Sequence, residues 1–167
     1  MVRFIERISH IVGALAAWLI VPLIAAMVWE VVARYVFNAP TIWAYEIGYL
    51  LTGSSFLLGM AYALSRDAHI RIDVMSSILS ERTKAVIDIV CYVGLLIPFC
   101  VWLTYTLWGR ALAAMMSGEK SGQSAWNPPL WPFRTVFFVA FALLLLQIIA
   151  EIAKAARRLK AQGVEAR

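Results

Sequence analysis

Residues 34–73 read RYVFNAPTIWAYEIGYLLTGSSFLLGMAYALSRDAHIRID, which contains a turn, an apolar segment and a charged segment. A proline disfavours the α conformation at the residue before it, so FNAP at 37–40 predicts the end of one helix and the start of another. The nineteen residues from Ile47 to Ser65 carry no charge. As a helix they would be about 28 Å long, close to the hydrocarbon thickness of a bilayer. This stretch therefore predicts a transmembrane helix with Glu46 at one end and Arg66 at the other.

The composition of the whole chain also indicates a membrane protein. Of the 167 residues, 62% are hydrophobic, and the mean hydropathy is +0.78. A soluble domain is usually nearer half apolar, so most of this chain must face lipid or other membrane helices. The formal net charge is +5, but the basic residues cluster beside apolar runs. That pattern favours an anionic lipid surface over nucleic acid. We expect no nucleic-acid partner.

Three further apolar stretches predict three further spans. The expected fold is an all-α integral membrane protein of one four-helix domain, residues 1–167. Pro22 lies near the middle of the first span and should bend it, and Pro98 interrupts the third. No small-residue cleavage site follows the first apolar stretch, so we expect an uncleaved spanning helix rather than a signal peptide. The expected helices cover about residues 11–36, 42–65, 84–116 and 130–157.

The basic residues predict the orientation of these spans. Four spans place both termini on one side, and eleven of the fifteen lysines and arginines lie on that side. Short cytoplasmic segments carry an excess of Lys and Arg, so both termini are expected in the cytoplasm and residues 117–129 outside. The eleven are Arg3, Arg7, Arg66, Arg71, Arg82, Lys84, Lys154, Arg157, Arg158, Lys160 and Arg167, against Arg34, Arg110, Lys120 and Arg134.

The second span presents two different faces. Small residues at four-residue spacing allow helix backbones to approach closely in lipid, so one face is expected to pack against a neighbouring helix. Glu46 points away from that face. Glu30, Arg34 and Glu46 all lie at the outer membrane level, and an ion-pair cluster would satisfy all three charges. The alternative is that Glu46 only reaches the lipid headgroups. The small face consists of Gly48, Thr52, Ser55, Gly59 and Ala63.

The sequence holds no pattern typical of a cofactor or an active site. His69 lies between Asp67 and Asp73, where we expect it to form hydrogen bonds that hold its loop. No spacing suits zinc, haem or a phosphate-binding loop, so no cofactor and no enzyme activity are expected. Ion and proton pathways normally need an ionisable residue near the bilayer midplane, and none of the four spans has one there. We expect the chain not to drive transport by itself.

The ordered motifs of this chain resemble those of a known family. An arginine-aromatic turn is followed by W-x-x-E, then by a glycine, then by R-x-x-H-I-x-x-D, and a G-Q-S segment precedes the last helix. This order resembles the DctQ-type small membrane subunit of tripartite ATP-independent periplasmic (TRAP) transporters. The matching residues are Arg34, Phe37, Trp43, Glu46, Gly59, Arg66, His69, Ile70, Asp73, Ser124 and Trp131.

The resemblance implies an accessory role in transport. The expected partners are a large TRAP permease subunit, a periplasmic substrate-binding protein and membrane lipid. The small subunit would stabilise the large one and help dock the binding protein, for sodium-driven uptake of a carboxylate-type solute across a bacterial or archaeal cytoplasmic membrane. Because the chain ends after its basic tail, the large permease is expected to be a separate chain.

A different class of function stays open at this stage. The alternative is a four-helix membrane anchor or cytochrome-like subunit of a respiratory complex. Its haem would need ligands inside the helices, where this chain has no histidine. A visible absorption spectrum separates the two interpretations.

Overall fold

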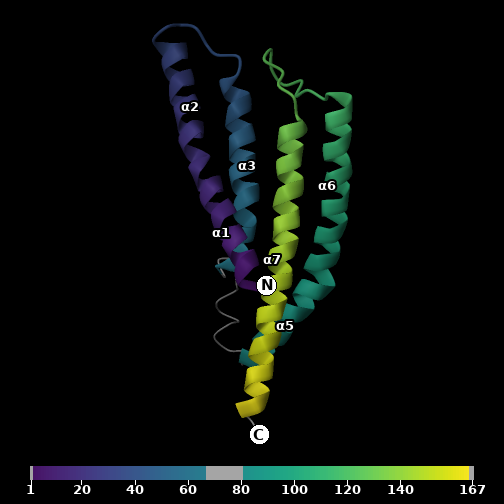
Figure 1. Ribbon diagram of the computed structural model, residues 1–167. Coiled ribbons are helices and arrows are strands. Elements are labelled where there is room, and N and C mark those ends of the chain that lie inside the picture. Colours follow the sequence, from purple (N-terminus) through teal and green to yellow (C-terminus); the bar gives the residue numbers. More distant parts are fainter. Residues whose placement is uncertain (1, 67–80, 166–167) are drawn as a thin grey trace.

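The computed structural model describes residues 2–66 and 81–165, and these form long helices that lie side by side (Figure 1). Short loops, residues 36–43 and 118–130, connect α2 to α3 and α6 to α7. In chain order the elements are α1 (Val2–Trp18), α2 (Ile20–Tyr35), α3 (Ala44–Ser65), α5 (Glu81–Cys91), the π-helical turn η1 (Tyr92–Leu96), α6 (Ile97–Ser117) and α7 (Trp131–Glu165).

The helices α3 and α7 form the centre of the bundle. The α3 helix packs against α1, α2 and α7, and α7 packs against α1, α3, α5 and α6. The loops 36–43 and 118–130 lie at one end of the bundle, here named the loop end, and both chain ends lie away from it, on the side here named the terminal end, where α7 extends well beyond the start of α1 (Figure 1). An even number of spans gives this arrangement.

The expectation of four membrane-length helices in an all-α protein is confirmed. Large apolar side chains point outward along them, among them Phe56, Leu95 and Tyr105. Outward apolar groups suit lipid, where backbone polar groups must be satisfied within the helix. Because α1 begins at Val2, the first span includes the basic segment before Ile11. The four spans are Val2–Tyr35, Ala44–Ser65, Val86–Ser117 and Trp131–Arg157.

Two prolines account for the irregular turns inside the spans. Pro22 has no N–H group for the carbonyl four residues earlier, that of Trp18, and α1 ends there before α2 begins at Ile20. Pro98 follows the π-helical turn η1, where the helix takes up an extra residue per turn just ahead of the proline ring. Both spans continue beyond these points, as helices in lipid commonly do at proline.

The core is small because the helices bury only one stripe each. Its main cluster joins α3, α6 and α7 through Leu64, Cys100, Leu144 and Ile148. Cys100 is buried and Cys91 is exposed, and both are free thiols. The limited core leaves most apolar surface for lipid or for another membrane protein.

Glycines show where helices approach most closely. A Cβ built on Gly13 of α1 would lie 2.6 Å from Cβ of Tyr62, and one built on Gly48 would lie 2.6 Å from Cε of Met27. A Cβ on Gly59 would meet nothing within 4 Å. The small face of α3 is therefore packed by the first span at Gly48, while Gly59 borders an open groove between α2 and α3.

Candidate functional site

The loop end contains the first group of polar contacts. The α2 helix ends at Tyr35, and Asn38 takes a positive φ of 51° that turns the chain toward α3. Glu30 Oε1 accepts a hydrogen bond of 2.9 Å from Arg34 Nε. Its Oε2 accepts one of 2.9 Å from the Thr41 backbone N–H and another from the Thr41 hydroxyl. Glu30 therefore connects α2 to the loop 36–43.

Glu46 lies in the first turn of α3 and has a different partner. Its side chain is fully buried, with 0% exposed. The Ser124 hydroxyl donates a hydrogen bond to Glu46 Oε1, while Oε2 has no partner in the structure. Ser124 also accepts a hydrogen bond from the Trp126 backbone N–H at 3.1 Å. The contact joins the loop 118–130 to the start of α3.

The loop 118–130 has a defined fold that presents Ser124. The Ser121 N–H donates a hydrogen bond of 3.0 Å to Pro128 O, beside the β-bridge between Lys120 and Pro129, so the two ends of the loop are paired. The Gly122 N–H donates to Asn127 Oδ1 at 2.8 Å. Gly122 has a φ of +63°, a conformation that glycine adopts without strain. Backbone pairing thus holds the loop over α3.

Of the expected cluster, Glu30 and Arg34 form an ion pair, whereas Arg34 and Glu46 form no direct ion pair among the described residues. Among the described residues, the carboxylate partner of Arg34 is Glu30, one helical turn earlier. Glu46 is buried instead and bonded to Ser124 of the loop 118–130. At the same end of the bundle, Glu30 therefore connects α2 to the loop 36–43, and Glu46 connects α3 to the loop 118–130.

A cavity of about 500 Å³ opens beside these contacts. Aromatic rings of Tyr45, Tyr49 and Phe133 form part of its wall, and Arg110 and Arg134 add two guanidinium groups. Arg134 forms an ion pair with Glu119, and its Nε has no hydrogen-bond partner in the described part of the chain. Aromatic surface next to Arg is typical of protein interfaces.

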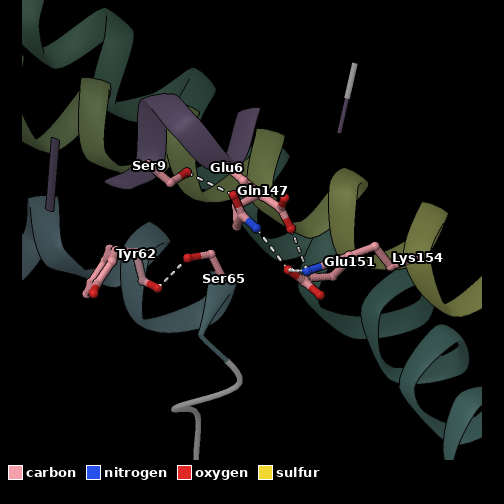
Figure 2. A network of polar contacts seen from close by, with 7 residues as sticks. All are labelled: Glu6, Ser9, Tyr62, Ser65, Gln147, Glu151 and Lys154. Atoms are coloured by element: carbon pink, nitrogen blue, oxygen red, sulfur yellow. Dashed lines mark hydrogen bonds and ion pairs between the residues drawn. The ribbon is translucent and has the colours of Figure 1, made fainter. Parts of the chain in front are cut away.

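The terminal end contains a second polar network, which joins α1 to α7 (Figure 2). The Ser9 hydroxyl donates to Gln147 Oε1 at 2.8 Å, and Gln147 Nε2 donates to Glu151 Oε1 at 2.8 Å. Lys154 Nζ lies 2.6 Å from Glu151 Oε1 and 2.9 Å from Glu6 Oε1. Sequence reasoning missed this network. The available signal was a glutamine at 147 inside an otherwise apolar run, because such residues usually form hydrogen bonds between membrane helices.

The other expected residues occupy separate places. Phe37 is exposed in the loop 36–43, Trp43 immediately precedes α3, and Trp131 is the first residue of α7. The Ser55 hydroxyl donates to Ala16 O at 2.9 Å, and Thr52 and Gly59 line the groove beside α2. Arg66 ends α3 with its guanidinium carbon 5.5 Å from the ring centre of Tyr62. His69 and Asp73 lie outside the described residues.

The described polar groups are arranged as joints between segments. No group of three or more His, Cys, Asp or Glu side chains gathers as a metal site within residues 2–66 and 81–165. The contacts at the loop end connect loops to α2 and α3, and those at the terminal end connect α1 to α7. Such contacts stabilise helix positions, and burial makes each of them costly to break.

Comparison with known proteins identifies relatives of the chain. The model of the family described as "Tripartite ATP-independent periplasmic transporters, DctQ component" matches residues 23–158. The chain is 30% identical over 77 residues to the sialic acid TRAP transporter small permease protein SiaQ of Vibrio cholerae, covering 46% of this chain and 44% of that protein. It is 24% identical over 101 residues to the sialic acid TRAP transporter permease protein SiaT of Haemophilus influenzae, covering 60% of this chain and 16% of that protein. The matched regions thus span less than half of either relative.

Proposed function

Because the chain belongs to the family of DctQ components of tripartite ATP-independent periplasmic transporters, we propose that it is an accessory subunit that stabilises a large permease. The family is one of transporters rather than of enzymes. With four membrane-length helices, the chain is a multi-pass protein of the inner membrane. The proposed role is structural support, with no direct contact to the transported solute.

The family match over residues 23–158 is the observation that carries this proposal. The names of the two relatives add to it. SiaQ is named a small permease protein, and the SiaT match covers only 16% of a longer permease protein. The same kind of sequence thus occurs as a small permease protein and as a part of a longer permease protein. We expect such a sequence to pack against the rest of the permease in both cases. We propose the same partner here, as a separate chain.

The distribution of charge supports an accessory role. No Asp, Glu, Lys or Arg occurs within residues 11–29, 47–65, 89–109 or 135–150. The described ion pairs lie toward the two ends of the bundle, at Glu30 with Arg34, Glu119 with Arg134, and Lys154 with Glu6 and Glu151. A coupled transport path normally needs polar groups near the midplane, so we place the ion and solute sites in the large permease.

The loop end is the surface we assign to the periplasmic binding protein. It combines the cavity next to Arg110 with exposed aromatic side chains at Tyr45, Trp126 and Trp131. In the expected orientation this end faces the periplasm. Docking there would deliver a carboxylate-type solute to the permease for sodium-driven uptake.

Co-purification tests the assembly directly. The full chain with an affinity tag is co-expressed with its cognate large permease, and the eluate is weighed by native mass spectrometry. The expected result is a stable complex of the two chains, whereas an unrelated four-helix membrane protein with the same tag should retain no permease. Elution of the chain without permease would contradict the proposal. A haem absorption band in the purified chain would favour the respiratory-anchor alternative.

A further inference from the structure

A second cavity lies at the terminal end, between the start of α1 and the end of α3. Its volume is about 570 Å³. Unlike the grooves along the spans, it is lined mainly by polar and charged side chains. The lining residues are Arg3, Glu6, Arg7, His10, Ile11, Ser65 and Arg66.

The charges around this cavity are unbalanced. Three arginines line it, and within the described part of the chain none of them has a carboxylate within ion-pair distance. The one carboxylate in the wall, Glu6, forms an ion pair of 2.9 Å with Lys154. Ser65 uses its hydroxyl hydrogen in a 2.7 Å bond to Tyr62 O. Counting only residues 2–66 and 81–165, the site therefore has a surplus of positive charge and guanidinium donors without a carboxylate partner.

The local structure directs these donors to one place. Arg3 and Arg7 are four residues apart on α1, so their side chains leave the helix on the same face. Tyr62 supports the opposite wall: Arg66 lies over its ring, and the His10 ring meets it edge-on with centroids 5.4 Å apart. Figure 2 shows Tyr62 and Ser65 on α3 beside the start of α1.

Exposed apolar side chains occur on the same helix as the arginines of the basic cavity: Ile11 lines the cavity, and Phe4 lies next to Arg3 in the sequence. Phe4 is 67% exposed and Ile11 is 52% exposed, and both belong to α1. An occupant that suits the whole surface carries a negative head next to hydrocarbon. A free anion would use the arginines only.

We propose that this cavity binds the phosphate of an anionic phospholipid headgroup in the cytoplasmic leaflet. Arginine matches phosphate oxygens with two parallel hydrogen bonds, and basic pockets between membrane helices on the cytoplasmic side are suited to such headgroups. The site gives Arg66 a role that the accessory function does not require. It rests on the proposed orientation of the spans, and it does not depend on the large permease.

Native mass spectrometry of the full chain in a mild detergent tests the site. The probes are phosphatidylglycerol, phosphatidylcholine and inorganic phosphate. We expect phosphatidylglycerol to bind more tightly than phosphatidylcholine, and millimolar inorganic phosphate not to displace it. Arg7→Gln and Arg66→Gln should each weaken the binding of phosphatidylglycerol about fivefold.

Matched variants separate a specific site from general charge. Arg157→Gln removes an exposed arginine of α7 outside the cavity and should leave lipid binding unchanged. Arg7→Lys keeps the charge and should lose less affinity than Arg7→Gln. Arg3→Gln tests the same site if a variant at position 66 loses its helical content by circular dichroism. Equal binding of the two lipids, equal loss in Arg157→Gln, or displacement by inorganic phosphate would each overturn the proposal.

Discussion

Glu46 is a carboxylate held at the edge of an apolar span by a single serine. Its side chain is fully buried, and the hydroxyl of Ser124 is its hydrogen-bond donor among the described residues. Removing the donor leaves a buried charged group unsatisfied, so Ser124→Ala should lower the free energy of unfolding by about 1–3 kcal/mol. Thermal unfolding of the purified full chain in detergent measures this loss.

The control for this prediction lies in the same loop. Ser121 Oγ accepts an exposed 3.3 Å hydrogen bond from the Gln123 N–H, which costs little to lose, so Ser121→Ala should be nearly neutral. Equal stability of the two serine variants would show that Glu46 does not depend on Ser124.

At the scale of elements, two glycines distinguish packed from open helix faces. Gly13→Ala would place a methyl group 2.6 Å from Tyr62 Cβ and force α1 away from α3, at a cost of about 1–3 kcal/mol. The same substitution at Gly59 meets nothing within 4 Å and improves helix propensity by up to about 1 kcal/mol. The free energy of unfolding of the isolated chain should therefore fall in Gly13→Ala and rise in Gly59→Ala. A loss of stability in Gly59→Ala as large as in Gly13→Ala would contradict this assignment.

The joint between α1 and α7 can be measured with a double-mutant cycle. Ser9 is 1% exposed and Gln147 is 0% exposed, so each depends on the other for a buried hydrogen bond. Hydrogen bonds between membrane helices contribute about 0.6–1.7 kcal/mol. We expect a coupling free energy in this range between Ser9→Ala and Gln147→Leu. The double variant should be more stable than the sum of the single losses implies, because the unpaired Ser9 hydroxyl that Gln147→Leu alone would leave is absent, while the lost bond to Glu151 is common to both variants at position 147. Additive losses would show that the pair does not interact.

The elements themselves follow from local rules that a single sequence contains. Long uncharged runs predict the spans, and Pro22 and Pro98 predict irregular turns because a proline removes one hydrogen bond four residues back. The pairing of side chains does not follow from such rules. Ser124 lies 78 residues from Glu46, and Gln147 lies 138 residues from Ser9. Sequence proximity therefore suggested Arg34 for Glu46, whereas the folded loop brings Ser124 to it.

At the scale of the whole molecule, the orientation of the bundle is a prediction from charge. Both termini lie at the terminal end of the bundle, and the basic residues favour the cytoplasm for that end. With Cys91 and Cys100 replaced by serine, an impermeant thiol reagent added outside should label Lys120→Cys and spare Arg157→Cys. Labelling only at position 157 would show that the orientation is reversed, with the terminal end outside and the loop end in the cytoplasm.

We propose that this chain supports transport by the large permease and moves no solute by itself. Proteoliposomes with an inward sodium gradient test this proposal, with the cognate permease, the binding protein and a radiolabelled carboxylate as the solute. We predict no uptake by this chain alone, uptake when all three proteins are present, and at least a tenfold lower rate when this chain is omitted. Uptake by the chain alone, or a full rate without it, would contradict the account.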